Sequence, residues 1–287
     1  MTTDPVTEVR SGEATKGAQA TPNIRETSPA RARSGPRPGD RRRLLNAASA
    51  TVLVGGALTL WEILVRARDV PIYLLPAPTD IARELWESGF RYLGAAGVTL
   101  GEALAGLLLG VAIGTLVATI ITFWSGLERG VLILAILIKA TPIVAIIPML
   151  IIWFGFGMGP KIIVTGLMTF FPVLVNVHAG LDAIDDATLA LFHSLNASRW
   201  EIFLHARWPA ALPYLFAALR VVGPLSLVGA VVAEWAGASS GLGRTMWLAY
   251  TNLDMPALFA AVVCSALMGV SLYGLMIALE TRIVFWK

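Results

Sequence analysis

Long apolar runs separated by short polar segments dominate the chain. A helix needs about 20 apolar residues to cross the hydrocarbon core of a bilayer, and several of these runs reach that length. They lie at about 44–65, 98–124, 131–154, 161–180, 213–235 and 255–279. The pattern predicts an all-α integral membrane protein with about six transmembrane helices.

Two of these runs carry features that bear on helix geometry and packing. Pro142 and Pro148 lie inside the third run and predict a kink there, because proline removes a backbone donor and crowds the preceding turn. The second run contains small residues four positions apart, which let helices pack closely in lipid. They are Gly101, Ala105, Gly106, Gly110 and Gly114.

The segment between the first two runs is predicted to lie at the membrane surface. Leu75–Pro78 reads as a loop, and Thr79 with Asp80 reads as the cap of a short helix. Trp86 and Tyr92 are side chains suited to the headgroup level.

Composition and charge agree with lipid as the solvent. Apolar residues make up 56% of the chain, charged residues only 14%, and the mean hydropathy is +0.71. A soluble domain carries about 25% charged residues. The partner of this surface is therefore predicted to be the lipid bilayer rather than nucleic acid.

Residues 1–43 differ sharply from the rest. They hold nine Lys or Arg against five Asp or Glu and few large apolar residues. We predict a disordered basic tail, held in the cytoplasm by Arg41–Arg43 directly before the first apolar run. With six spans, the C-terminus and the 181–210 connection are cytoplasmic too, and residues 44–287 form the transmembrane domain.

The 181–210 connection is polar yet strongly helical in its signals. Asp185 or Asp186 is predicted to cap a helix through about Leu195. Asn196 tolerates the left-handed backbone that ends a helix. We predict two short helices that meet at a sharp turn, forming an elbow between spans four and five.

The second helix of this elbow has its own start and stop signals. Ser198 and Glu201 have the spacing of a capping box. Pro209 and Pro213 are predicted to end this helix before the fifth span begins.

The sequence of this elbow resembles that of a known family. The stretch 194–220 is similar to the cytoplasmic "EAA" loop of the permease subunits of ABC importers, in which Glu-Ala-Ala is followed by a glycine and a terminal proline. The matches to the nitrate, sulfonate and taurine branch of that family cover about residues 45–285. They are 75–81, 153–157, 170–172, 197–200, 209–213, 229–234 and 241–243.

The resemblance implies a site and a mechanism. The elbow would bind a groove on a separate ATPase subunit and couple ATP-driven closure to alternating access. The coupling residues it implies are His193, Ser194, Leu195, Asn196, Ala197, Ser198, Arg199 and Trp200. Two positions depart from the pattern: Ala190 replaces the acidic residue, and Asn196 replaces the glycine.

The resemblance also implies partners. They are a cytoplasmic ATP-binding subunit, an extracytoplasmic solute-binding protein and a second permease copy in a homodimer of a bacterial cell membrane. The chain has no G-x-x-x-x-G-K-[ST] phosphate loop, so the energy comes from a partner or an ion gradient. We therefore expect no enzymatic activity and no cofactor of its own.

Four ionisable residues fall within or near spans: Glu102, Lys139, Arg220 and Glu234. Such residues tend to face a bundle interior or a pathway. Lys139, just before Thr141, is the candidate for the translocation pathway. Glu234 is a candidate outer gate, or a hydrogen-bond partner of the 237–243 loop. The three histidines share no metal-binding spacing, so no metal site is predicted.

Three other functions remain to be weighed. An ion-coupled secondary transporter would be built from inverted repeats, and we see none. A membrane-embedded enzyme needs a convergent catalytic cluster, which the sequence does not show. A structural subunit would not need the elbow. Within the family reading, the solute is a sulfonate, nitrate, bicarbonate, or a vitamin precursor such as a pyrimidine or riboflavin.

Overall fold

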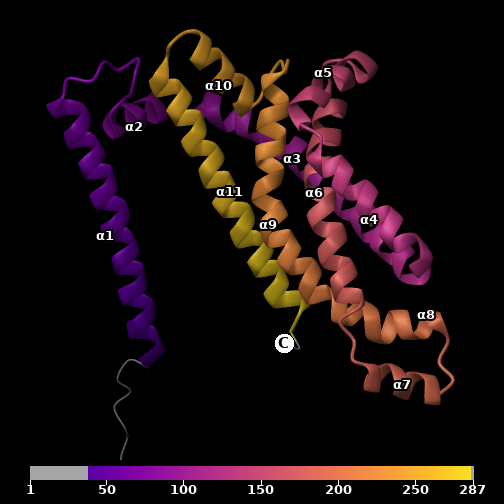
Figure 1. Ribbon diagram of the computed structural model, residues 1–287. Coiled ribbons are helices and arrows are strands. Elements are labelled where there is room, and N and C mark those ends of the chain that lie inside the picture. Colours follow the sequence, from indigo (N-terminus) through magenta and orange to yellow (C-terminus); the bar gives the residue numbers. More distant parts are fainter. Residues whose placement is uncertain (1–37, 286–287) are drawn as a thin grey trace, which may run out of the picture. The chain divides into compact units, whose positions relative to one another are not determined.

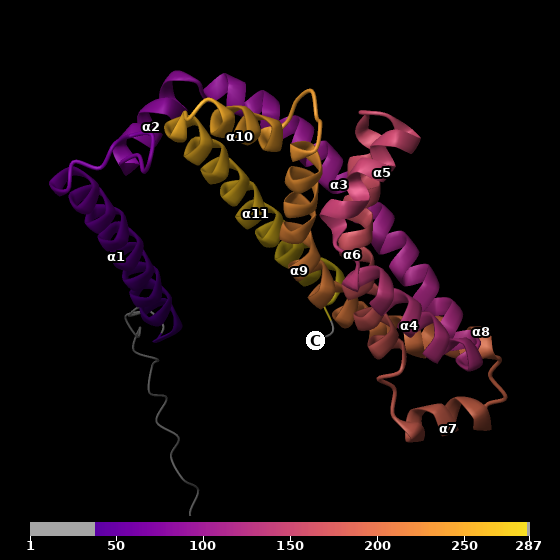
Figure 2. The ribbon, with the colours of Figure 1, turned by 45° about the horizontal axis from the view of Figure 1, so that its top comes forward.

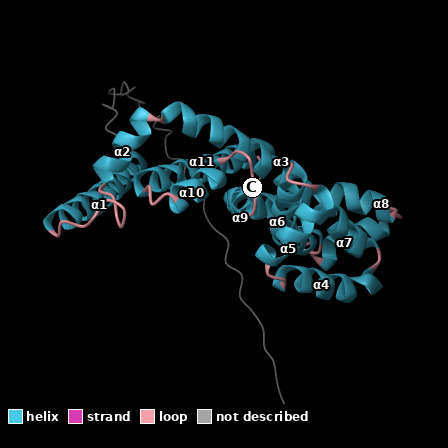
Figure 3. Ribbon diagram, turned by 90° about the horizontal axis from the view of Figure 1, so that it is seen from above, coloured by secondary structure: helices cyan, strands magenta, loops and turns pink. Residues whose placement is uncertain are grey.

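The computed structural model describes residues 38–285, and helices account for most of them, with no strand in this range (Figure 3). The chain divides into two compact units, residues 1–53 and 54–287. In the first, the described residues form the beginning of helix α1 (Pro38–Ala67). The predicted tail 1–43 lies outside the described residues up to position 37. Its last six positions belong to helix α1.

Three long helices form the centre of the second unit. Helix α6 (Met158–Leu181) packs against both α3 (Gly89–Phe123) and α9 (Trp208–Trp235). The core between them is apolar and includes the fully buried Val173, Leu174 and Val222. Helix α11 (Met255–Ile283) packs against α9 and against α10 (Leu242–Thr251).

Glycines set the close approach of α3 to α6. A methyl group at Gly106 or Gly110 would overlap atoms of α6, including the backbone carbonyl of Gly166 beside Gly110, and one at Gly114 would make a tight contact with α6. The predicted packing role of these three residues is therefore confirmed. At Gly101 the same test finds open space, so this residue takes no part in the contact.

Membrane-crossing length and hydropathy are found in four helices of the described residues. They are α3, α6, α11 and the helix Arg199–Trp235. Large apolar side chains on them, such as Leu108, Val221 and Val270, point outward and are more than 60% exposed. Lipid is the solvent that such a surface requires.

The predicted third span is two helices rather than one kinked helix. Helix α4 (Ser125–Ala140) and α5 (Ile143–Phe154) meet at 90°. The break falls at Thr141 and Pro142, whereas Pro148 lies inside α5. The bend at Pro142 is much sharper than the kink that proline alone produces in a continuous helix. The pair can form a fifth span.

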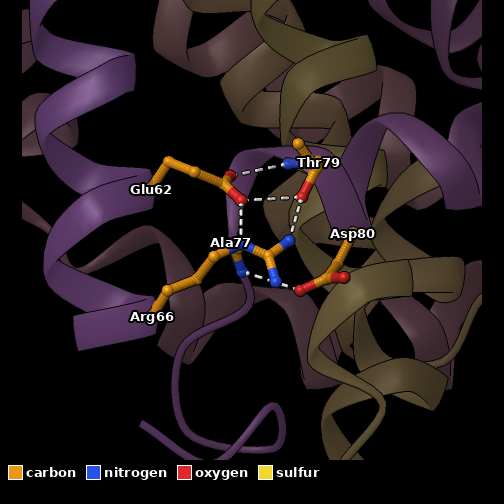
Figure 4. Close-up of polar contacts among 5 residues, drawn as sticks. All are labelled: Glu62, Arg66, Ala77, Thr79 and Asp80. Carbon is orange, nitrogen blue, oxygen red and sulfur yellow. Dashed lines mark hydrogen bonds and ion pairs between the residues drawn. The ribbon is translucent and has the colours of Figure 1, made fainter. Parts of the chain in front are cut away.

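The segment before α3 forms the short helix α2 (Pro78–Glu87). Its N-cap is Ala77, not Thr79 as predicted, although Asp80 does accept a hydrogen bond from the Ala77 amide. Thr79 instead donates through its amide and its hydroxyl to Glu62, which also pairs with Arg66 (Figure 4). The last turns of α1 are thereby bound to the start of α2.

The two aromatic residues of this region have different environments. Trp86 is 90% exposed, as expected of a residue at the headgroup level. Tyr92 is buried and donates to Glu84 at 2.8 Å and, at 3.4 Å, toward the carbonyl of Ala257. Tyr92 therefore joins α2, α3 and α11, which corrects its predicted surface position.

Different short helices lie at the two ends of the bundle. Helices α2 and α10 lie at one end in Figures 1 and 2. The short helices α7 (Asp186–Ser194) and α8 (Arg199–Ile202) lie at the other.

Candidate functional site

The elbow begins with a capped helix. Asp185 is the N-cap of α7, and its carboxylate accepts hydrogen bonds from the amide and the hydroxyl of Thr188 at 3.0 and 2.7 Å. These bonds favour the ionised form and lower the pKa of the Asp185 carboxyl. Helix α7 ends at Ser194, one residue before the predicted end.

Asn196 makes the sharp turn. Its φ is 54°, in the left-handed region, as predicted. The Asn196 amide donates to the carbonyl of His193, and the Ala197 amide donates to that of Phe192, both at 3.0 Å. This pair of bonds is a Schellman motif, which satisfies carbonyls left open at the helix end. Asparagine thus fills the position that is glycine in the resembled loop.

The second arm of the elbow starts with the predicted capping box. Glu201 accepts from the amide of Ser198 at 2.7 Å, and the Ser198 hydroxyl accepts from the amide of Glu201 at 3.3 Å. Both arms are therefore fixed by local hydrogen bonds, so the elbow keeps a defined angle without a partner.

The predicted end of this arm at Pro209 and Pro213 is wrong, because both prolines lie inside α9. Helix α8 continues through a π-helical segment, Phe203–Arg207, into α9, and the three form one helix from Arg199 to Trp235. In the π segment the Trp208 amide donates to Phe203, five residues earlier. A proline in a regular helix collides with the carbonyl four residues before it. The wider π turn just before Pro209 relieves that crowding.

Aromatic and ionic contacts attach the elbow to the bundle. Trp200 stacks on Phe123 at the end of α3, with ring centroids 6.1 Å apart, and on Phe203 at 5.3 Å. Arg207 donates to Asp182, just past the end of α6, at 3.0 Å. These contacts join the elbow to the ends of α3 and α6 and to the helix that continues into α9.

All eight predicted coupling residues lie in this elbow. Seven are exposed, and Ala197 is half-buried. Apolar side chains lie open beside them, since Leu195 is 70% and Trp200 is 56% exposed. A cavity of about 350 Å³ is lined by residues of both arms, including His193 and Arg199, and by residues at the α3–α4 junction. The elbow therefore presents an exposed, partly apolar surface.

A second candidate region is a buried polar cluster near the opposite end of the central helices. Glu234 of α9 accepts a hydrogen bond from the hydroxyl of Thr99 at 2.7 Å and another from the Gly243 amide at the start of α10. The expected hydrogen bond to the 237–243 loop is therefore present. A methyl group at Gly241 or Gly243 would collide with the Glu234 side chain.

Lys161 and Glu102 form a buried ion pair that sequence reasoning missed. Their side chains are 8% and 1% exposed, and the ammonium nitrogen lies 2.6 Å from Glu102 Oε1. The sequence placed Lys161 at the edge of a span and left the partner of Glu102 open. The signal was a lysine at a span boundary, which is more commonly read as an interfacial anchor.

The remaining candidate pathway residues lie elsewhere. Lys139 Nζ is 4.6 Å from the ring centroid of Phe171 in α6, and Thr141 caps the end of α4 through its hydroxyl bond to the Leu137 carbonyl. Among the described residues no ion pair joins Lys139 to Glu234. Arg220 pairs with Glu280 of α11 at 3.3 Å.

Metal ligands do not converge within the described part of the chain, where no group of three or more His, Cys, Asp or Glu side chains could hold an ion.

The turn at Asn196 gives a direct prediction. Asn196→Val is expected to destabilise the elbow by about 1–2 kcal/mol, because a left-handed backbone costs an ordinary L-residue about that much. Asn196→Gly is expected to leave it unchanged. Limited proteolysis of the purified protein, read as the rate of cleavage near residue 196, checks the pair. Equal rates for the two variants would contradict the role of the backbone angle.

Comparison with known proteins shows the family to which this chain is similar. The family of binding-protein-dependent transport system inner membrane components matches residues 106–285. A formylaminopyrimidine transport permease protein of Halalkalibacterium halodurans is 34% identical over 80% of this chain and 92% of its own length. A probable ABC transporter permease protein of Haemophilus influenzae is 33% identical over 77% and 91%. A riboflavin transport system permease protein of Chloroflexus aurantiacus is 31% identical over 80% and 87%.

Proposed function

This chain belongs to the family of binding-protein-dependent transport system inner membrane components, and on that premise we propose that it moves a small polar solute inward by alternating access driven by a separate ATPase subunit. The observation that carries the proposal is the elbow. It is stiffened by its own caps, exposes an apolar surface, and is bonded to α3, α6 and α9.

Continuity of the helix supports the transmission of movement. One helix runs from Arg199 in the elbow to Trp235, and it carries Glu234 in the buried cluster near its other end. A displacement of the elbow by an ATPase therefore acts on the α9–α10 junction without passing through a flexible loop. This arrangement supports Glu234 as an outer gate and leaves Lys139 and Thr141, at the α4–α5 bend, as pathway candidates.

The proposed topology has six spans: α1, α3, the α4–α5 pair, α6, α9 and α11. Both termini and the elbow then lie in the cytoplasm, and α2 and α10 lie at the outer surface. The basic tail supports this orientation through the positive-inside preference. So does the placement of the elbow at the end of the bundle opposite α2 and α10 (Figure 1).

The proposed assembly contains two permease copies in a bacterial inner membrane, cytoplasmic ATP-binding subunits and an extracytoplasmic solute-binding protein. Binding-protein dependence is a property of the family, which supports the last of these. For the solute we propose a nitrogen-containing heteroaromatic compound of the pyrimidine or flavin kind. The support is that two relatives above 30% identity are named for formylaminopyrimidine and riboflavin transport.

The test is capture of the ATPase through the elbow. The C-terminally tagged protein is extracted in mild detergent, and co-purifying proteins are identified by mass spectrometry. We expect a P-loop ATPase with the native protein and its loss from an Ala197→Glu, Arg199→Glu variant. Arg83→Glu reverses an exposed charge on α2, far from the elbow in sequence, and serves as the matched control that should retain the ATPase.

Two results would contradict the proposal. If no ATPase is captured even after cross-linking in native membranes, an ion-coupled secondary transporter becomes the leading hypothesis. If the ATPase is retained by the elbow variant, the docking surface lies elsewhere. With the complex reconstituted, stimulation of ATP hydrolysis by pyrimidines but not by sulfonates is expected of the proposed solute class.

A further inference from the structure

The buried polar cluster joins four helices at one point. Thr99 and Glu102 come from α3, Lys161 from α6 and Glu234 from α9, while α10 contributes the backbone amides of its first turn. Thr99, Glu102 and Glu234 are 0% exposed, and Lys161 is 6% exposed. Water has no direct access to these groups, so the cluster must satisfy its charges and hydrogen bonds internally.

Hydrogen-bond accounting leaves one oxygen open. Glu102 Oε1 accepts from Lys161, and both oxygens of Glu234 accept bonds from Thr99 and Gly243. The Thr99 hydroxyl itself accepts from the Leu242 amide at 2.8 Å. Glu102 Oε2 is buried and has no hydrogen-bond donor facing it. An unpaired buried carboxylate oxygen costs more than an unpaired neutral group.

The open oxygen lies beside a second carboxyl group. Thr99, whose hydroxyl donates to Glu234, lies one helical turn before Glu102 on α3, and this places the two carboxyl groups in the same buried cluster. Two ionised carboxylates have only acceptors to offer each other, so a hydrogen bond between them requires a proton on one of them. One proton shared between the two carboxyl groups therefore gives Glu102 Oε2 the hydrogen bond that it lacks.

The charge balance of the cluster also requires one bound proton. With both carboxyl groups ionised, Lys161 balances only one of them and leaves one net negative charge in an apolar surrounding. Like-charged carboxylates that share a dry site hold a proton between them for this reason. With one proton bound, the cluster is neutral and every oxygen has a partner.

We propose that Glu102 and Glu234 together bind a single proton at neutral pH, in a buried site that Lys161 keeps electrically neutral and that joins α3, α6, α9 and α10. The groups that face the pair are Lys161 from α6, Thr99 from α3 and the amides of Leu242 and Gly243 from α10. Loss of the proton places a net charge at the junction of α9 with α10, and the site thus makes this junction sensitive to pH.

Infrared difference spectroscopy of the purified protein in lipid tests the proton directly. On raising the pH from neutral to alkaline, the native protein is expected to lose the carbonyl-stretch band of a protonated carboxylic acid. Glu234→Gln and Glu102→Gln should each abolish this change. Glu87→Gln, at an exposed position on α2, is the matched control and should keep it. Absence of the band in the native protein, or its persistence in Glu234→Gln, would overturn the proposal.

Thermal stability gives a second, independent readout. The folded protein holds a proton that the unfolded chain releases at neutral pH, so stability falls as the pH rises through the release of that proton. Glu234→Gln removes the ionisable group, and its amide nitrogen cannot accept the second of the two bonds that Thr99 and Gly243 donate to Glu234. It is therefore expected to lower the melting temperature at neutral pH and to lose the decline with rising pH.

Sodium is the competing occupant of a carboxylate site. If the alkaline decline disappears when sodium replaces a large organic cation in the buffer, the site binds a metal cation and the proton proposal is wrong. Both readouts use the isolated protein and no solute or ATPase. Their failure is thus distinguishable from failure of the importer proposal.

Discussion

Lys161→Met is expected to lower the free energy of unfolding by about 3–5 kcal/mol, the cost of removing one partner of a buried ion pair. The ammonium lies 2.6 Å from Glu102 Oε1, and both side chains are almost fully buried. Its removal leaves a carboxylate in an apolar interior with no compensating charge. Equilibrium unfolding in mixed detergent micelles measures the change.

Lys139→Met is the matched control for this prediction. Lys139 is exposed on α4 and touches only the face of Phe171 among the contacts of its ammonium group that the structure describes. An exposed cation–π contact contributes about 0.5–1 kcal/mol, so the control variant should stay close to the native stability. Similar losses for the two variants would contradict the distinction between a buried pair and an exposed lysine. A transport defect in Lys139→Met at native stability would support its place in the pathway.

Gly110→Val is expected to destabilise the protein by about 3 kcal/mol, at the upper end of the usual cost of overpacking a core. Any side chain at this position meets Thr169 and the backbone of Gly166. Backbone atoms cannot rotate away as a flexible side chain does, so α3 and α6 must separate.

Gly101→Val tests the same substitution on the same helix where the space is open. It is expected to leave stability unchanged or to raise it slightly, because valine has a higher helix propensity than glycine. The unfolding assay used for Lys161 applies here as well. If Gly110→Val proves as stable as Gly101→Val, close contact between α3 and α6 is not what holds the bundle together.

The elbow could be predicted almost residue by residue because its signals are local. A cap at Asp185, a left-handed residue at Asn196 and the Ser198–Glu201 box each depend on hydrogen bonds within a few positions. Such bonds form wherever the backbone makes that turn, whatever packs around it. The same holds for Asp80, whose bond to the Ala77 amide closes the start of α2.

Features that depend on distant parts of the chain could not be predicted. Glu102 and Lys161 are 59 positions apart, and nothing in either neighbourhood selects the other. A proline at 142 indicates a break, but the 90° angle depends on how α4 and α5 pack on the rest of the bundle. Pro209 was read as a stop because a proline disfavours a regular helix, and a π turn is a tertiary solution to that conflict.

The π segment Phe203–Arg207 also determines how the start of the helix at Arg199 is rotated about the helix axis relative to α9. A π turn contains one residue more than the α-helical turn it replaces, and each residue of a helix turns it by about 100°. If the same residues formed a regular α-helix instead, the extra residue would rotate the first turn of the helix by about that angle. Trp200 would then point away from Phe123, on which it now stacks. By accommodating one additional residue locally, the π turn therefore sets the direction in which the elbow faces relative to the membrane-crossing part of the same helix.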